Sequence, residues 1–391
     1  MPHRPIYLDN HATTPVDQQV LEAMLPYFTE HFGNPSSINH AYGWAAEAIV
    51  KQSRQTIAEA INATPEEIIF TSGATEANNL AIKGVAEAYF NQGRHIITVV
   101  SEHRAVLEPC QYLASLGFEI TYLPVNETGL INLNQLEKAI RAETILVSIM
   151  TANNEIGVIQ PIAEIGAICQ AKQVLFHTDA AQAVGKIPVD VQKMQVDLLS
   201  LTAHKIYGPK GIGALYIRRR QPRVRIAPQM HGGGQERGLR AGTLCPPQIV
   251  GLAEAVKLTT TELTSESARL LHLRARLWSK LKQLPGIYLN GDPEQRLPGN
   301  LNISVEGVDG TALFLGIQPI VAVSSGSACS SRRTEPSHVL TALGRTSKLA
   351  YASIRFGLGR FTTREEIDTV AEAVISTITA LRQSSPSATQ K

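Results

Sequence analysis

Short apolar runs alternate with longer amphipathic segments along this chain, and that alternation most constrains its fold. The runs are EEIIFTS, HIITVVS, TILVSIM, VLFHTD, VDLLSLTAH and IGALYIRR. Runs of this length and composition predict strands buried on both faces. Between them lie segments such as ATEANNLAIKGVAEAYFNQG and LNQLEKAIRAE, which have helical spacing of apolar residues. The alternation predicts an α/β fold with a mainly parallel sheet covered by helices.

The length of 391 residues predicts two domains, because single hydrophobic cores stop growing at about 250–300 residues. The character of the sequence changes near Thr260, where a polar helical stretch leads into shorter strand-like runs and a final helix. We therefore predict a large domain over 15–261 and a smaller α+β domain over 262–391. Residues 1–14 are predicted to form an N-terminal arm that packs with the small domain.

The composition excludes several classes of protein. Hydrophobic residues make up 43% and charged residues 18%, and the formal net charge of +2 gives no reason to expect binding to nucleic acid or an anionic membrane. The N-terminus lacks a signal-peptide pattern, and no run approaches the roughly 18 apolar residues of a membrane span. The four cysteines have neither zinc spacing nor a disulfide pattern. We therefore expect a cytoplasmic protein without a metal site.

Lys205 directly follows the apolar run VDLLSLTAH and precedes a glycine-containing turn. A lysine at a strand end is a candidate for Schiff-base chemistry, because desolvation and nearby positive charge lower its pKa and supply a neutral amine. An ordinary loop lysine shows the same local pattern. Lys205 alone therefore does not decide between these interpretations.

Asp179 and Gln182 give this lysine a context. Asp179 ends the run VLFHTD, and Gln182 follows three residues later. The carboxyl ends of strands in open α/β sheets face the crevice that binds ligands. A buried carboxylate there can keep the pyridine nitrogen of pyridoxal 5′-phosphate (PLP) protonated, as the cofactor's electron-sink chemistry requires. A helix N-cap would also explain Asp179, but not its pairing with Lys205.

A phosphate site is predicted in FTSGATEANNLAIKG, where a strand and a tight glycine turn lead into a helix that opens at Ala74 and Thr75. Free backbone N–H groups and the positive end of the helix dipole suit a phosphate dianion. Thr202 and His204, beside the lysine, can add two donors. The same pattern occurs at ordinary helix N-termini, so this signal is only moderately specific.

Two further strand ends carry polar residues that suit the same cofactor. His103 follows HIITVVSE and can lie on the cofactor ring while it moves protons near neutral pH. Asn154 follows TILVSIMTA and can bond a ring oxygen or the substrate. A single histidine after a strand is more often structural. Suitable groups at several successive strand ends instead predict one shared pocket.

Cys329 differs from the other cysteines in its surroundings. It lies in SSGSACSS, a small polar loop that cannot bury it well, so we predict a nucleophile that can move to a ligand. Cys110, Cys169 and Cys245 are predicted to be structural. Arg355, in ASIRFGLGRFT, is a candidate bidentate partner for an amino acid's α-carboxylate, and a surface arginine is an equal alternative.

A set of motifs runs nearly the whole length of the chain: YLDNHATTP, GNPSS, SGATEANN, HTDAAQ, HKIYGPKGIG, LRAGTL, SSGSACSS and IRFGLGRFTT. Together they resemble the cysteine desulfurases of iron–sulfur cluster assembly, a class V group of fold-type I PLP-dependent transferases. SSGSAC is similar to the bacterial housekeeping and nitrogenase-associated branch (NifS/IscS-like). Thr202-Ala203-His204 replaces a common Ser-Gly-His but keeps the hydroxyl, and Ala241 replaces a common serine.

The resemblance implies a role in cofactor binding for each candidate. Lys205 would form the Schiff base, and Asp179 would pair with the pyridine nitrogen. Gln182 would bond the ring oxygen, and His103 would stack on the ring. The residues implied for the phosphate are Ala74, Thr75, Thr202 and His204, with Thr243 contributed by the partner subunit of a homodimer.

The resemblance also implies the reaction. Asn34, Asn154 and Arg355 would bind L-cysteine, which would become L-alanine while Cys329 takes the sulfur as a persulfide. Iron–sulfur scaffolds or other acceptor proteins, including those of tRNA thiolation, would collect it. Three alternatives stay open: a selenocysteine lyase with the same pocket, a general aminotransferase in which Cys329 is incidental, and a non-catalytic scaffold that binds assembly proteins.

Overall fold

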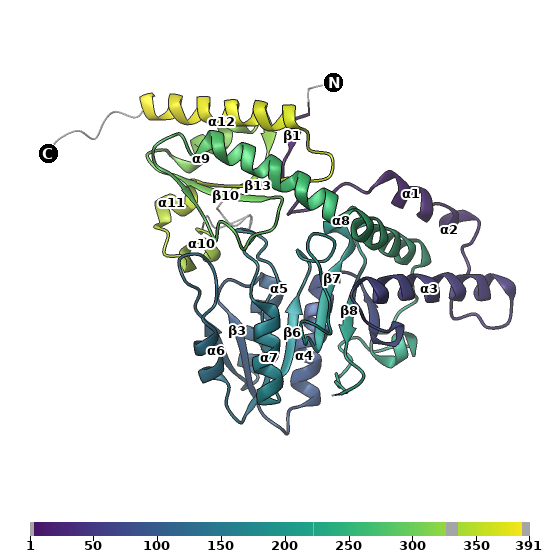
Figure 1. Ribbon diagram of the computed structural model, residues 1–391. Helices are drawn as coiled ribbons and strands as arrows, with labels where there is room; N and C mark the ends of the chain where they lie inside the picture. Colours follow the sequence, from purple (N-terminus) through teal and green to yellow (C-terminus); the bar gives the residue numbers. More distant parts are fainter. Residues whose placement is uncertain (1–3, 222, 326–334, 385–391) are drawn as a thin grey trace.

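The computed structural model describes residues 4–221, 223–325 and 335–384. A seven-stranded sheet lies in the lower part of Figure 1 and a four-stranded sheet in the upper part, each with helices packed on it. The helices are α1 (Gln18–Met24), α2 (Pro26–Thr29), α3 (Ala41–Ala60), α4 (Ala74–Ala88), α5 (Arg104–Ser115), α6 (Leu133–Ala139), α7 (Ile162–Lys172), α8 (Pro246–Leu281), α9 (Gly310–Ile317), α10 (His338–Ala342), α11 (Ser347–Tyr351) and α12 (Arg364–Ser384).

The large sheet has the order β2-β8-β7-β6-β5-β3-β4. Strand β8 is antiparallel to both neighbours, and the other pairs are parallel, so the prediction of a mainly parallel sheet is confirmed. The apolar runs do not predict β4, because this edge strand is half-exposed. The strands are β2 (Ile68–Thr71), β3 (His95–Val99), β4 (Glu119–Leu123), β5 (Thr144–Ser148), β6 (Leu175–Asp179), β7 (Leu198–Thr202) and β8 (Gly213–Ile217).

Both faces of this sheet are buried, as the unbroken apolar runs predict. Successive side chains of a strand point to opposite faces. Phe70 and Phe176 therefore pack on one face, with α3, α7 and the first part of α8. Their chain neighbours Ile69 and Leu175 pack on the other face, with α4 and α5. Each fully buried side chain of this size contributes about 1.5–3 kcal/mol, so the two layers hold the strand ends firmly in place.

The smaller sheet is antiparallel, with the order β12-β13-β10-β9. Helices α9 and α12 and the second part of α8 pack with it in a separate apolar cluster. Near the N-terminus, β1 (Ile6–Tyr7) pairs in parallel with β11 (Val321–Ala322), so the start of the chain lies against this part of the fold. The other strands are β9 (Ile287–Leu289), β10 (Asn300–Val305), β12 (Ser324–Ser325) and β13 (Ser353–Gly357).

Helix α8 connects the two parts. The predicted boundary between 261 and 262 falls inside this helix, which is continuous from Pro246 to Leu281. Ile249 and Val256 in its first part belong to the core of the large sheet, whereas Leu273 and Leu277 belong to that of the small sheet. The change near Thr260 thus coincides with a change of packing partner along one helix, and the division into two domains stays a prediction.

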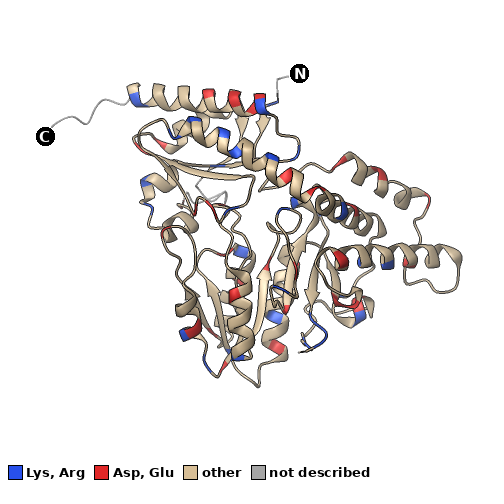
Figure 2. Cartoon of the chain, in the orientation of Figure 1, with Lys and Arg blue, Asp and Glu red and all other residues tan. Residues whose placement is uncertain are grey.

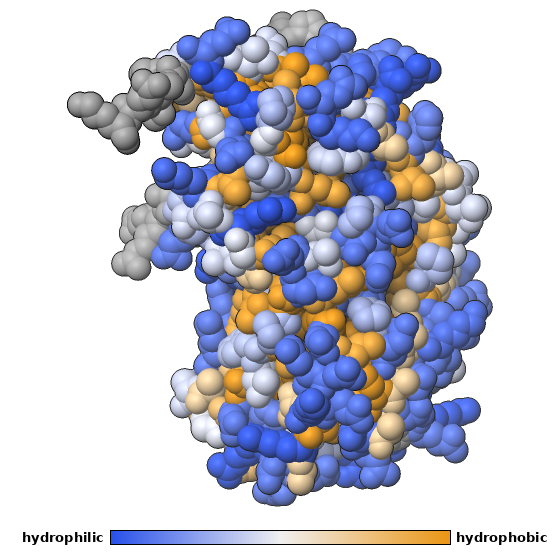
Figure 3. Space-filling view, turned by 60° about the vertical axis from the view of Figure 1, so that its left-hand side comes forward, coloured by the Kyte–Doolittle hydropathy of each residue, from blue (hydrophilic) through white to orange (hydrophobic). Residues whose placement is uncertain are grey.

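The surface of the molecule carries mixed charge. Figure 2 shows basic and acidic residues spread over both parts of the chain, in keeping with the formal net charge of +2. On the face in Figure 3, hydrophilic side chains predominate and hydrophobic residues show between them. Within the described ranges, no helix has the length and apolar character needed to cross a membrane.

Candidate active site

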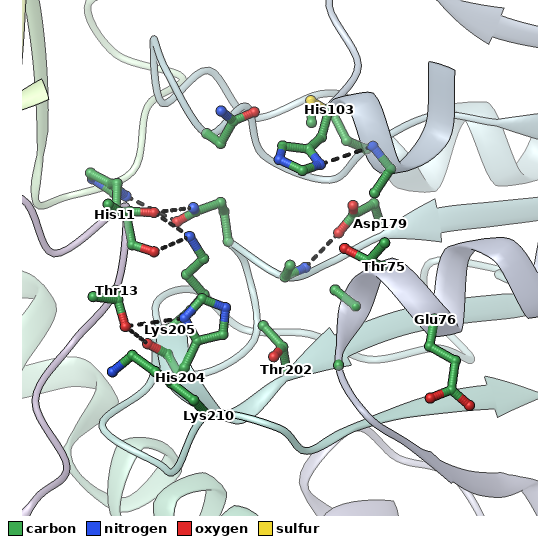
Figure 4. A pocket seen from close by; sticks show the side chains of 18 of the residues that line it. His11, Thr13, Thr75, Glu76, His103, Asp179, Thr202, His204, Lys205 and Lys210 are labelled. Carbon is green, nitrogen blue, oxygen red and sulfur yellow. Dashed lines mark hydrogen bonds between the residues drawn. The ribbon is translucent and has the colours of Figure 1, made fainter. Parts of the chain in front are cut away.

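A cavity of about 700 Å³ lies where the carboxyl ends of the central strands face the small sheet. Figure 4 shows Lys205, Asp179, His103 and Thr75 around it. Most of the residues predicted from the sequence line it together, although they are far apart along the chain. These are Ala74, Thr75, His103, Asn154, Asp179, Gln182, Thr202, His204, Lys205 and Arg355.

Lys205 enters the cavity from a short 3-10 turn, Ala203–Lys205, that follows β7. Its Nζ donates to the carbonyl oxygens of His11 and Ala12, across 2.5 Å and 2.7 Å. Burial, and then the charge of Arg355, lower the pKa of Lys205 to about 8. A sizeable fraction of this amine is therefore neutral near physiological pH, as an attacking amine requires.

Asp179 ends β6 and is buried, with 5% of its surface exposed. One carboxylate oxygen, Oδ2, accepts from Asn78 Nδ2 across 2.7 Å, and Oδ1 accepts from the backbone N–H of Ala181 across 2.9 Å. The second bond resembles the capping interaction that the sequence also allowed. The first is not local, because Asn78 lies on α4, and it fixes the carboxylate at the edge of the cavity.

The start of α4 forms one wall of the cavity. Gly73, the residue before the helix, has φ of 150° and ψ of −179°, and a Cβ there would lie 3.6 Å from Thr202 Oγ1. Glycine is the residue that adopts this backbone conformation without strain. Ala74 and Thr75 follow at the first turn, where backbone N–H groups have no partner within the helix. This donor set suits an anion such as a phosphate group.

His103 and His204 are both neutral imidazoles beside the cavity. His103 caps α5, and its Nδ1 accepts from the backbone N–H of Ala105 across 3.1 Å. Burial lowers the pKa of His103, and Lys205 adds to this effect against the opposing charge of Asp179. Burial and the neighbouring lysines lower the pKa of His204 to about 4. A neutral His103 whose Nδ1 accepts a hydrogen bond carries its proton on Nε2.

Arg355 reaches the cavity from β13 of the small sheet and is 9% exposed. Its Nη2 donates to Asp9 Oδ1 and to Ser324 Oγ, and its Nη1 donates to the carbonyl oxygen of Asn154. Among the described residues, its buried Nε has no hydrogen-bond partner. The surface-arginine alternative is therefore wrong, because this guanidinium is buried and held by both parts of the fold.

Two predicted residues do not line the cavity in the part of the chain that the structure describes. Asn34 is exposed, and its Oδ1 accepts from the backbone N–H of Ser36 across 2.9 Å. Thr243 is also exposed. Among the described residues, neither Asn34 nor Thr243 lines the cavity formed by this chain. Cys329 lies outside the described residues.

Sequence reasoning missed part of the cavity wall. His11, Ala12 and Thr13 line it, as does Lys210. The motif YLDNHATTP contains the first three, but no local pattern says that this segment reaches the large sheet. It does so because Thr14 donates to the carbonyl oxygen of His204, next to Lys205. Before it, β1 pairs with β11, more than three hundred residues later in the chain.

Comparison with known proteins identifies the family of this chain. Residues 6–370 match the family described as Aminotransferase class-V. "Cysteine desulfurase, mitochondrial" from Arthroderma benhamiae is 57% identical over 386 residues, which cover 98% of this chain and 76% of the relative. "Cysteine desulfurase IscS" from Aeromonas hydrophila is 55% identical over 384 residues, which cover 98% of this chain and 95% of the relative.

Solved structures are similar over nearly the whole length. A structure described as "NIFS-LIKE PROTEIN" has a TM-score of 0.90 and 40% identity, and the match covers 96% of this chain and 100% of that one. A second, "SspA in complex with cysteine", has a TM-score of 0.80 and 40% identity, with 92% and 100% coverage.

Proposed function

The chain belongs to the class-V aminotransferase family and is a cysteine desulfurase, and on this basis we propose that Lys205 holds PLP and that Cys329 receives the sulfur of L-cysteine. The observation that carries the proposal is the meeting of Lys205, Asp179 and the start of α4 in one cavity. An amine of lowered pKa, a buried carboxylate and a helix N-terminus match the aldehyde, the pyridine nitrogen and the phosphate of PLP.

The residues around the cavity suit the cofactor's other groups. Gln182 would donate to the ring oxygen, and His103 would lie against the ring. The phosphate would be held by the first turn of α4. Bound there, PLP supplies an electron sink that stabilises negative charge on the carbon atoms of the substrate. The other phosphate-binding residues would be Thr202, His204 and Thr243, the last from the partner subunit of a homodimer.

L-Cysteine would bind with its carboxylate at Arg355. The guanidinium is a planar fork of donors that matches a carboxylate, and burial strengthens such a pair. Asn154 lines the same region of the cavity, and Asn34 is the second amide proposed to contact the substrate.

Lys205 and His103 would move the protons of the reaction. Lys205 has a lowered pKa, so its amine can take a proton from carbon and return it. The neutral His103 carries its proton on Nε2 and can give it up there, for example to the product.

The sulfur would leave the substrate by attack of the Cys329 thiolate on the cysteine sulfur atom. A bond forms between the two sulfur atoms as the carbon–sulfur bond of the substrate breaks. The electron pair of that broken bond stays with the substrate carbon, which then gains a proton to give L-alanine. The persulfide on Cys329 would then pass to acceptor proteins, such as scaffolds of iron–sulfur cluster assembly or proteins of tRNA thiolation, in the cytoplasm.

A homodimer would complete the site, because the proposed phosphate contact of Thr243 needs a second chain. Large apolar side chains around α1–α3 are exposed, and a partner would cover them. They include Leu25, Phe28, Phe32, Ile38 and Trp44, each more than half exposed. Light scattering on the purified protein tests this point.

The proposal is tested by mass spectrometry of the purified protein after addition of L-cysteine, with L-alanine assayed in parallel. We expect a gain of one sulfur atom on Cys329 together with alanine. Cys329→Ser should abolish both, and Cys245→Ser is the matched control, because Cys245 is an exposed cysteine outside the cavity. Alanine formation that survives Cys329→Ser would contradict the assigned nucleophile. A parallel assay with L-selenocysteine separates the lyase alternative.

A further inference from the structure

Two residues hold the side-chain amide of Gln182 at three points. Its Nε2 donates to the carbonyl oxygen of His11 across 2.9 Å. Its Oε1 lies 3.0 Å from His11 Nδ1 and accepts from Lys186 Nζ across 2.7 Å. Gln182 and His11 are 4% and 3% exposed. The orientation of the Gln182 amide is therefore fixed by protein groups and not by water.

The chemistry of these groups determines which atom of the amide faces which partner. A carbonyl oxygen can only accept a hydrogen bond, so the amide nitrogen of Gln182 must face the carbonyl of His11. The amide oxygen then faces the imidazole ring. Because this oxygen also only accepts, Nδ1 of His11 must carry a proton.

The protonation state of the second ring nitrogen of His11, Nε2, follows from burial. Burial, and then the charges of Lys186, Arg355 and Lys205, lower the pKa of His11 well below its ordinary value, against the opposing bond from Gln182. The ring is therefore neutral, with its only proton on Nδ1. Within the part of the chain that the structure describes, Nε2 is buried and has no hydrogen-bond partner. The structure thus assigns one tautomer to His11.

Among the described residues, one N–H of the Gln182 amide has no hydrogen-bond partner. The oxygen of its amide already accepts two bonds, and one N–H is used on His11. The remaining N–H belongs to a side chain that lines the cavity. The same carbonyl oxygen of His11 accepts from Lys205 Nζ, and Figure 4 shows His11 beside Lys205. His11 therefore links an amide donor and the amine of the site.

We propose that His11 is a positioning residue, whose ring N–H orients and polarises the Gln182 amide so that its remaining N–H meets the ring oxygen of PLP. The inference rests on the proposed function, in which Gln182 bonds that oxygen. Donors on the amide oxygen make its N–H a stronger donor. A donor to the ring oxygen favours the more negative form of the bound cofactor, so loss of the ring N–H of His11 raises the pH at which the cofactor loses its proton.

The test is a pH titration of the visible absorbance of the PLP-loaded protein without substrate. His11→Leu removes the ring donor and should raise the midpoint by about half a pH unit, the size expected for one lost hydrogen bond. His11→Asn should restore the wild-type midpoint, because asparagine Nδ2 lies where histidine Nδ1 lies. In a Gln182→Leu background, His11→Leu should produce no additional shift.

An unchanged midpoint in His11→Leu, or a shift of equal size in the Gln182→Leu background, would overturn the proposal. A second measurement uses the unsubstituted protein, so it does not depend on the folding of a variant. Histidine-selective ¹⁵N NMR of the cofactor-free protein should show His11 neutral with its proton on Nδ1. A proton on Nε2 would refute the proposed hydrogen bond from the His11 ring to the Gln182 amide. A protein that takes up no PLP instead refutes the proposed function, whatever the tautomer of His11.

Discussion

Arg355 Nη2 donates to Asp9 Oδ1 across 2.8 Å, so the guanidinium proposed to bind the substrate carboxylate is held by a residue near the start of the chain. The same nitrogen donates to Ser324 Oγ across 2.6 Å. Asp9 reaches this position because β1 pairs with β11 and because Asp9 itself forms a bridge to Gly357, two residues after Arg355. The guanidinium of Arg355 is thus oriented by two protein partners, Asp9 and Ser324.

Asp9→Asn should weaken binding of cysteine more than it slows turnover. The amide keeps one acceptor for Arg355 but loses the charge, and a hydrogen bond to a charged partner contributes about 1.5–3 kcal/mol. We therefore expect KM for L-cysteine to rise by about tenfold or more, with a smaller change in kcat. Ser324→Ala is the matched control, because it removes the neutral acceptor on the same nitrogen. Equal effects of the two variants on KM would contradict a special role for the charge of Asp9.

Arg240 should be needed for tight binding of PLP. It donates from Nε and Nη2 to the carboxylate of Glu76, which lies in the first turn of α4 beside the proposed phosphate site. Burial opposes ionisation of Glu76, but bonds from Arg240 and Ser72 prevail and lower its pKa, so the carboxylate is charged. Arg240→Gln would leave this charge near the phosphate, and the dissociation constant of PLP should rise by roughly tenfold.

A double substitution separates this electrostatic effect from a structural one. Glu76→Gln combined with Arg240→Gln removes both charges, so PLP affinity should recover toward the wild-type value. Fluorescence or absorbance titration of the cofactor-free protein with PLP measures both constants. If the double variant binds PLP as weakly as Arg240→Gln, the charge on Glu76 is not the cause.

The residues at strand ends were predictable from the sequence because parallel strands bring their carboxyl ends to one edge. Lys205, Asp179 and His103 each follow a buried apolar run, and such runs identify both the strand and its end. His11 and Asp9 were not predictable in this way. His11 lines the cavity and Asp9 holds Arg355, and both are brought there by a segment that pairs with distant parts of the chain, which leaves no trace in the local sequence.

The remaining sequence predictions depend on what lies outside a single chain or outside the described residues. Thr243 is exposed, and its proposed phosphate contact would be made across the interface of a homodimer. Asn34 is also exposed, and its side chain is engaged in a local turn with Ser36. The proposed role of Cys329 rests on its polar loop sequence and on the resemblance to the family.

Asn78 should support the charge of Asp179. Its Nδ2 donates to Asp179 Oδ2 across 2.7 Å in a fully buried position, and the carboxylate keeps only the bond from Ala181 if this donor is lost. A hydrogen bond to the ionised form favours that form, so Asn78→Leu should weaken the support for the carboxylate proposed to pair with the pyridine nitrogen. Activity at neutral pH should fall by about tenfold, as expected for one charged hydrogen bond.

The variant Asp179→Asn provides the matched reference for this prediction. Asp179→Asn should be less active than Asn78→Leu at every pH, since it cannot ionise at all. Activity of Asn78→Leu within about twofold of the wild type would contradict a supporting role of Asn78 for the carboxylate of Asp179.

Uptake of PLP by the cofactor-free protein should report the pKa of Lys205. Burial and the charge of Arg355 lower this pKa from 10.5 to about 8. Only the neutral amine attacks an aldehyde, so the rate of uptake should rise about tenfold per pH unit below pH 8 and level off above it. Stopped-flow absorbance between about pH 7 and pH 11 measures the rate, a range that also contains the ordinary titration of lysine. Arg355→Gln removes one cause of the shift, so the plateau should begin at higher pH. A rate that still climbs about tenfold per unit at pH 9 in the wild type would mean that Lys205 titrates like an exposed lysine, and the cavity would then lack the neutral amine that the proposed chemistry needs.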